Sequence, residues 1–355
     1  MIALFVFLAT LGQGADHTPF YADKADLLYY LDESNSRVVV ETPEAWTHRR
    51  NHILDNMQMV MGPLPEMDRS MPPAYDVIEE EVFPQYRRQT IHYTVDGWDK
   101  VPAFLFLPTR DGDEERLLPA ALCLHPTSPI GKRVVAGEGE RANRNYAVEL
   151  AERGYVTLAP DYPGFGDYVD ARKRLYNEGY VSCTMKGIVN HIRAIDLLQS
   201  LPQVDPERIG CIGHSLGGHN TLFVSVFDSR VKVAVTSCGF TTFAKYMDGD
   251  LTGWTHDGYM PRIDSVYDKD PARMPFDFTE VVAAIAPRAL FICAPVNDHN
   301  FEVSGVKDAV NAARPVFELF GAQENLRAAY PDAEHDFPTE TRHAAYAFMD
   351  VILKK

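Results

Sequence analysis

Apolar residues recur along this 355-residue chain in blocks that predict strands and helices in alternation. Apolar runs of strand length occur at residues 86–93, 101–108, 120–124, around 156, 209–212, 231–237 and 289–294. Helical spacing is found at residues 143–153, 183–201 and 216–227. Such alternation predicts an α/β fold, with a mostly parallel central sheet and helices on both of its faces.

The first 85 residues do not follow this alternation. Residues 42–61 predict an amphipathic helix, with Trp46, Ile53, Met57 and Val60 at helical spacing, and Gly62 followed by Pro63 ends it. We expect residues 16–85 to form an N-terminal helical extension that packs on a catalytic domain over residues 86–355.

The extreme N-terminus is apolar and then becomes rich in small residues near Gly12 and Gly14. Residues 1–15 resemble the apolar region and cleavage zone of a signal peptide and are too short to span a bilayer. No basic residue precedes Lys24, which is atypical of such a signal. The segment predicts export to the periplasm or the medium; the alternative is a buried N-terminal segment of a cytoplasmic protein.

An aromatic-rich stretch separates the sixth predicted strand from the seventh. Residues 239–282 are longer than a crossover between neighbouring strands needs. The functional interpretation is a lid or side wall over the site, and the alternative is a structural excursion whose aromatic rings pack on each other. We expect Trp254 and Tyr259 to face a ligand, with Phe240 and His214 as weaker candidates for the pocket.

The most specific motif is Gly213-His214-Ser215-Leu216-Gly217, between a short apolar strand and a run that can start a helix. This G-x-S-x-G spacing is typical of a nucleophile elbow, in which the serine backbone is strained. Glycines two residues before and after the serine avoid collisions with neighbouring backbone. The motif predicts Ser215 as a nucleophile; the alternative is a glycine-rich turn with a solvated serine.

An acid and a histidine should follow the serine in chain order, each on a loop after a strand. Asp298 follows the strand at 289–294, and His335 follows a shorter apolar run. His335 would accept the serine proton and Asp298 would orient the imidazole ring. The competing acidic residues are Asp161, Asp332, Glu334 and Asp336, and His299 is a further residue that could line the site.

The oxyanion hole needs two backbone amides. One is expected from Leu216, the residue after the nucleophile, and the other from the loop after the strand at 120–124. Thr127 is the first choice there because Pro126 has no N–H to donate, and Ser128 is the second. His125 is expected to be structural.

Together these motifs resemble the α/β-hydrolase superfamily, and within it the dienelactone-hydrolase-like and acetyl-xylan-esterase-like branches. The matching segments are LCLHPTS, YVTLAPDYPGFGD, DPERIGCIGHSLGGH, APRALFICAPVNDH and YPDAEHDFP. The chain lacks the HGGG turn of hormone-sensitive-type lipases, and Ser215 stands where small dienelactone hydrolases carry a cysteine. The resemblance implies an α/β-hydrolase fold and cleavage of short acyl esters, such as acetyl esters of a carbohydrate.

Charge and cysteine content restrict the binding partners, disulfides and metal sites that we expect. The formal net charge of −16 argues against nucleic acid and against anionic membrane surfaces. The five cysteines, three of them inside predicted strands, indicate no disulfide framework. No C-x-x-C or H-E-x-x-H spacing occurs, so we expect neither a metal site nor a cofactor.

These observations predict a serine hydrolase that cleaves carboxylic esters through an acyl-enzyme intermediate. One alternative is a peptidase similar to prolyl oligopeptidases, which share these motifs; the segment before Tyr86 is too short for the propeller domain that usually accompanies them. Another is a hydrolase-fold binding protein without activity, which the complete serine, aspartate and histidine set disfavours. The oligomeric state is not predicted.

Overall fold

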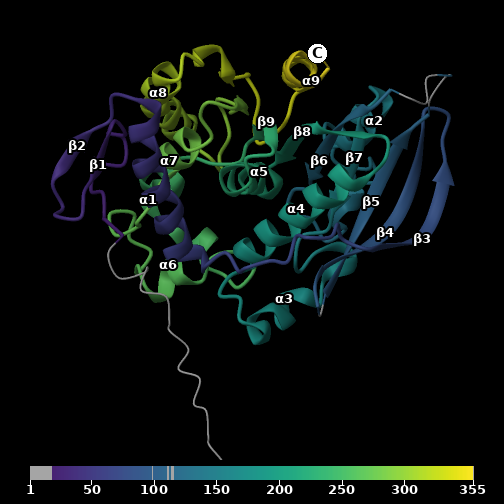
Figure 1. Cartoon of the computed structure of the whole chain (residues 1–355), viewed down its shortest axis with the longest axis horizontal. Helices are drawn as coiled ribbons and strands as arrows, with labels where there is room; N and C mark the ends of the chain where they lie inside the picture. Colours follow the sequence, from purple (N-terminus) through teal and green to yellow (C-terminus); the bar gives the residue numbers. More distant parts are fainter. Residues whose placement is uncertain (1–17, 98, 110–111, 113–115, 355) are drawn as a thin grey trace, which may run out of the picture.

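A nine-stranded sheet runs through the centre of the protein, in the strand order β11-β10-β9-β8-β6-β7-β5-β4-β3 (Figure 1). The computed structural model describes residues 18–97, 99–109, 112 and 116–354. The strands are β3 (Tyr75–Val82), β4 (Tyr86–Asp96), β5 (Asp99–Pro108), β6 (Leu118–Leu124), β7 (Val156–Pro160), β8 (Val204–His214), β9 (Val231–Ser237), β10 (Ala289–Cys293) and β11 (Leu326–Ala329). From β7 to β11 neighbouring strands are parallel, whereas β3, β4 and β5 are antiparallel to their neighbours.

Helices cover both faces of this sheet, as the alternating pattern predicts. They are α1 (Pro43–Met61), α2 (Tyr146–Glu152), α3 (Ala171–Arg174), α4 (Cys183–Ser200), α5 (Leu216–Phe227), α6 (Arg262–Ser265), α7 (Phe278–Ala283), α8 (Val303–Leu319) and α9 (Thr339–Leu353). Helices α4 and α5 pack on one face, and α2 and α9 on the other.

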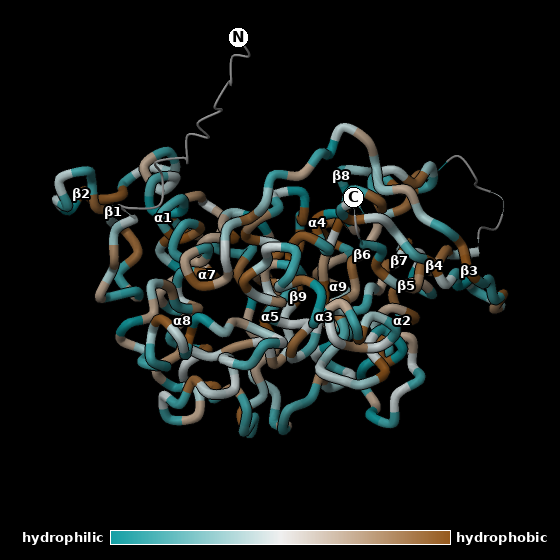
Figure 2. Tube along the Cα trace, turned by 90° about the horizontal axis from the view of Figure 1, so that it is seen from below, coloured by the Kyte–Doolittle hydropathy of each residue, from teal (hydrophilic) through white to brown (hydrophobic). Residues whose placement is uncertain are grey.

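Alternate residues of a central strand enter the two cores. Leu122 and Leu124 of β6 belong to the core beneath α4 and α5, while Ala121 and Cys123 belong to the core beneath α2 and α9. This division follows from the two-residue period of a strand. In Figure 2 hydrophobic stretches of the trace run through the central strands and α4, whereas many connecting loops are hydrophilic.

The sheet starts earlier than expected. Strand β3 pairs with β4 in antiparallel register, so the boundary predicted at Tyr86 would divide a pair of strands within one sheet. The strand was missed because it lies at the sheet edge, where nearly every residue is exposed and no apolar face is needed. Its charged run Glu79–Glu80–Glu81 suits an exposed edge.

The N-terminal extension contains the predicted helix and a short hairpin, formed by β1 (Tyr29–Leu31) and β2 (Arg37–Val39). The Thr42 side chain caps α1 by accepting from the Ala45 amide at 3.2 Å. An ion pair between Arg49 of α1 and Glu280 of α7, 2.8 Å long with both side chains fully buried, joins the extension to residues 239–282.

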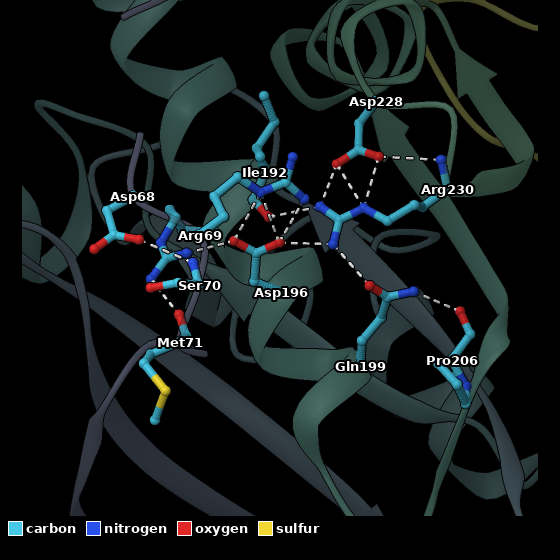
Figure 3. Close-up of polar contacts among 11 residues, drawn as sticks. Asp68, Arg69, Ser70, Met71, Ile192, Asp196, Gln199, Pro206, Asp228 and Arg230 are labelled. Carbon is cyan, nitrogen blue, oxygen red and sulfur yellow. Dashed lines mark hydrogen bonds and ion pairs between the residues drawn. The ribbon is translucent and has the colours of Figure 1, made fainter. Parts of the chain in front are cut away.

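The linker after α1 is held to the domain by a polar cluster (Figure 3). Asp196 of α4 accepts from Arg69 of the linker at 2.7 Å and from Arg230 at 2.6 Å. Arg230 also binds Asp228, at the end of α5. Because Asp196 is largely buried and shared by cations from separate segments, it orders the linker along the domain surface.

All five cysteines are buried and unpaired. Within the described part of the chain, no helix combines the length and the apolar character needed to cross a membrane. The segment at residues 1–15, for which we predict export, lies outside the described residues.

Candidate active site

Ser215 stands at a sharp corner between β8 and α5. Its backbone φ of 56° and ψ of −119° are rare for a residue with a side chain. The corner is held by the Ser215 amide, which donates to the Ser237 carbonyl at 2.8 Å, and by the Gly218 amide, which donates to the Ser215 carbonyl. This is the strained strand-to-helix turn that the G-x-S-x-G spacing predicts.

The two glycines of the motif are required by close backbone approach. A Cβ atom on Gly213 would overlap the carbonyl of Gly217, and one on Gly217 would overlap the carbonyl of Leu124. Both collisions involve backbone, which cannot move aside as a flexible side chain can. The sequence spacing therefore has the steric origin expected of an elbow.

Asp298 and His335 lie on the loops that follow β10 and β11. The His335 Nδ1 atom is 2.9 and 3.0 Å from the two carboxylate oxygens of Asp298. The Asp298 side chain is almost fully buried, while that of His335 is 24% exposed. The parallel pairing of β10 with β11 brings these loops together, although 37 residues separate the two side chains.

The Asp298 carboxylate is stabilised in its ionised form. Burial acts to raise its pKa, but the hydrogen bond from His335 and those from the amides of Asn300 and Phe301 hold the pKa below its ordinary value. Asp298 can therefore present a negative charge to the imidazole ring.

The earlier acidic candidate, Asp161, has a different environment. Its carboxylate is buried, and it accepts from both the backbone amide and the Nζ atom of Lys132, at 2.8 and 2.6 Å. His125 is also buried, and its Nε2 accepts from the Tyr162 amide at 3.0 Å. Both residues brace the loops after β6 and β7, in keeping with the structural roles expected for them.

Two of the acids near His335 in the sequence bind other partners. Asp332 accepts from Asn297 at 2.8 Å, and Asp336 accepts from Arg144 and Asn143. His299 is exposed on the loop. None of these contacts competes with the Asp298–His335 pair.

Arg144, on the loop before α2, binds the loop that carries His335. This guanidinium is 4% exposed; it binds the Asp336 carboxylate and donates to the His335 carbonyl at 3.1 Å. The sequence carries no signal for this contact, because 191 residues separate Arg144 from His335. Only the folded chain identifies Arg144 as a residue that supports the position of His335.

A cleft of about 840 Å³ opens over the serine and the histidine. Ser215, His335, His214, Thr127 and Arg144 are among its lining residues. The volume lies in the range of small-molecule binding sites. The structure thus places the nucleophile candidate and the base candidate on one accessible surface.

Of the two residues expected to supply the amides of the oxyanion hole, Thr127 lines this cleft and Leu216 directly follows Ser215 in the chain. Leu216 is the first residue of α5, and its side chain is buried. Thr127 is on the loop after β6, and its hydroxyl is 2.9 Å from the Tyr259 hydroxyl. A helix N-terminus beside the serine favours negative charge on a bound ligand.

Two of the four residues expected in the pocket lie outside it. Trp254 is 3% exposed and Phe240 is 2% exposed, and neither lines the cleft. The expectation that Trp254 faces a ligand is wrong for this structure, because the aromatic residues of the 239–282 segment pack on each other. Tyr259 does not line the cleft itself, but its hydroxyl contacts that of Thr127, which does. His214 lines the cleft, and the centroid of its ring is 4.9 Å from that of the His335 ring.

Within the described residues, one group combines side chains that could ligate a metal ion. Cys238, Asp298 and His335 have ligand atoms within 4.8 Å of one another. Asp298 and His335 already satisfy each other by hydrogen bonding. Burial raises the pKa of the Cys238 thiol well above its ordinary value, which disfavours the thiolate that a metal requires. The geometry therefore fits an oriented histidine better than a metal site.

Comparison with known proteins decides the family. The family model described as "Prolyl oligopeptidase family" matches residues 142–353. The chain belongs to the prolyl oligopeptidase family. The match covers the elbow and the loops of Asp298 and His335, and it confirms the α/β-hydrolase assignment made from sequence motifs.

This prolyl oligopeptidase family member is similar to the protein YtaP of Bacillus subtilis (strain 168), with 26% identity over 275 residues, 74% of this chain and 86% of the relative. Among solved structures it is similar in fold to a glucuronoyl esterase from Solibacter usitatus, with a TM-score of 0.72, 19% identity, and coverage of 94% of this chain and 98% of that one. An acetyl xylan esterase candidate from Bacteroides fragilis gives a TM-score of 0.60 at 16% identity, covering 86% of this chain and 85% of that one.

Proposed function

We propose that this protein is a serine esterase that uses Ser215, His335 and Asp298 to cleave carboxylic esters. The observation that supports this most directly is the Asp298–His335 pair at 2.9 Å beside a cleft that also contains Ser215. His335 Nδ1 faces the carboxylate, so the Nε2 atom is the one left to exchange a proton with the serine.

The reaction then follows two steps. The Ser215 hydroxyl attacks the ester carbonyl while His335 takes its proton, and the amides of Leu216 and Thr127 bind the oxyanion. The tetrahedral intermediate expels the alcohol, which receives the proton from His335, and an acyl-enzyme remains. Water attacks this acyl-enzyme with His335 again as base, which releases the carboxylic acid and restores the serine.

The preferred substrate is a short acyl ester of a hydroxyl-rich alcohol. The cleft carries charged side chains on one wall, which suits a polar alcohol better than a lipid tail. The name of one similar fold, an acetyl xylan esterase candidate, points to the same class, whereas the name glucuronoyl esterase points to an ester whose acyl part is a sugar acid.

A peptidase is the second candidate, because the matching family model is that of the prolyl oligopeptidases. Both reactions use the same nucleophile and base, so the catalytic residues alone do not separate them. Amide cleavage demands more of the acid that protonates the leaving group, and the two functions are separable by substrate.

The test compares chromogenic esters of graded acyl length with a proline peptide amide. The proposal expects hydrolysis of acetyl esters, slower cleavage of long-chain esters, and little amide cleavage. Ser215→Ala should abolish turnover, with Ser265→Ala, an exposed serine on α6, as the matched control. Preference for the peptide amide would establish the peptidase, and absence of any turnover would favour a binding protein.

We also propose that the protein is exported, on the apolar composition of residues 1–15. N-terminal sequencing of the protein recovered from cell fractions tests this. An intact N-terminus found only in the cytoplasmic fraction would contradict export.

A further inference from the structure

One wall of the cleft is unusually rich in charge. It is formed by the loop before α2, which contributes Glu138, Glu140, Arg141 and Arg144. At about 840 Å³ the cleft is larger than a small acyl group requires, so it has room for substrate groups that flank the ester. These four charges are therefore positioned to select the groups that flank the ester.

Two of the four charges are balanced within the protein. Glu138 forms ion pairs with Arg88 and with Arg133, the latter at 3.8 Å. Arg144 is buried against Asp336. Neither group needs a ligand for its charge to be compensated.

Arg141 differs from these residues. It is exposed, and it has no hydrogen bond or ion pair to any residue that the structure describes. Burial is the main reason why the pKa of His214 lies well below its ordinary value, and Arg144, His335 and Arg141 add to that lowering in this order. Arg141 and the nucleophile candidate Ser215 line the same cleft.

Glu140 is also exposed and without an ion-pair partner among the described residues. Both Glu140 and Arg141 line the cleft, but only the positive charge of Arg141 can attract an anionic group of a substrate. In a protein with a net charge of −16, an arginine with no ion-pair partner among the described residues, in the cleft that contains Ser215, is a local attraction for anions. A guanidinium binds a carboxylate through two parallel hydrogen bonds.

We propose that Arg141 binds a carboxylate of the substrate, so that the enzyme prefers esters carrying a negative charge close to the scissile bond, as on an acidic sugar. This inference rests on the proposed esterase function and adds the substrate class to it. Arg141 would then determine specificity, with no part in the chemical steps at Ser215.

The test uses two acetyl esters that differ in one charge: 4-acetoxybenzoate, which is anionic, and 4-acetoxybenzamide, which is neutral and has the acetyl group as its single ester. The quantity measured is the kcat/KM for the anionic ester divided by the kcat/KM for the neutral ester. We expect Arg141→Gln to lower this ratio about tenfold, the effect of losing one charge-assisted contact. Arg141→Lys should retain part of the preference, because the charge remains but the two-pronged geometry is lost.

Glu140→Gln is the matched control, since it removes a charge of opposite sign from the same loop. In Glu140→Gln the ratio of kcat/KM for the anionic ester to that for the neutral ester should stay constant or rise. Added salt should reduce the ratio in the wild type and have less effect in Arg141→Gln. Thermal unfolding of each variant verifies that it is folded; Arg141 has no partner in the described structure whose loss would destabilise it.

An unchanged ratio in Arg141→Gln, or an equal fall in Glu140→Gln, overturns the inference while leaving the esterase function intact. If the wild type hydrolyses neither ester, the proposed function itself fails and the inference falls with it. The two failures are therefore distinguishable.

Discussion

Replacing Trp254 by alanine separates a structural role from a role in substrate binding. The indole is 3% exposed and lies among aromatic rings, with ring centroids 4.8 Å from His219, 5.6 Å from Tyr246 and 5.7 Å from Phe278. Trp254→Ala removes this packing from the interior of the 239–282 segment. We therefore expect a loss of stability, with only a secondary effect on KM.

The size of the loss follows from burial. A buried indole removes roughly 150–250 Å² from water, worth about 4–6 kcal/mol as an upper figure at about 25 cal/mol per Å². The Nε1–H of Trp254 has no partner in the described structure, and releasing an unpaired buried donor returns about 1–3 kcal/mol. The net expectation is a loss of about 3 kcal/mol, in line with measured aromatic-to-alanine changes. At roughly 2 °C per kcal/mol for a large domain, Tm falls by about 6 °C.

The assay combines urea unfolding with kinetics on a minimal acetate ester and on an acetylated sugar. Val266→Ala, at an exposed position in the same segment, is the control and should change stability by less than about 0.5 kcal/mol. A loss below about 1 kcal/mol in Trp254→Ala, together with a KM raised only for the sugar ester, would refute the structural interpretation. The indole would then face the substrate, as the sequence alone suggests.

Three further outcomes are expected. Asp298→Asn should reduce kcat by about 10⁴-fold with little change in stability. Asp161→Asn, which breaks a fully buried ion pair with Lys132, should instead lower the unfolding free energy by about 3–5 kcal/mol. The reverse result would mean that Asp161 is the catalytic acid. Gly217→Ala should prevent folding or abolish turnover, since its Cβ overlaps a carbonyl, while Gly97→Ala, which meets no atom, should do neither. Burial raises the pKa of Glu280 to about 7, so the folded state holds a proton that the unfolded state releases at lower pH. The stability of the wild type relative to Glu280→Gln should therefore fall as the pH rises from about 5 to about 8. A rise in relative stability over this range would mean that the ion pair with Arg49 dominates.

The local steric constraints and the hydrophobic periodicity of this protein could be recognised from the sequence alone. The alternation of strands and helices follows from short-range hydrophobic spacing, and it predicted the sheet from β4 onward. The elbow was readable because each glycine of its motif is required by a neighbouring backbone within the same turn. The order serine, acid, histidine, on loops after strands, also led to Asp298 and His335, whose contact the structure contains.

Contacts between distant segments were decided only by the tertiary structure. The sequence left several acids open, and strand pairing between β10 and β11 is what puts Asp298, and no other acid among those considered, against the His335 ring. An aromatic-rich, aspartate-rich segment looks the same whether its rings face a cleft or each other, so the burial of Trp254 and Phe240 could not be read from it. The charge of Arg141 likewise became informative only when the fold showed that the neighbouring charges Glu138 and Arg144 are paired and that of Arg141 is not. Patterns within a few residues record local geometry, whereas charge compensation and burial depend on which distant segments meet.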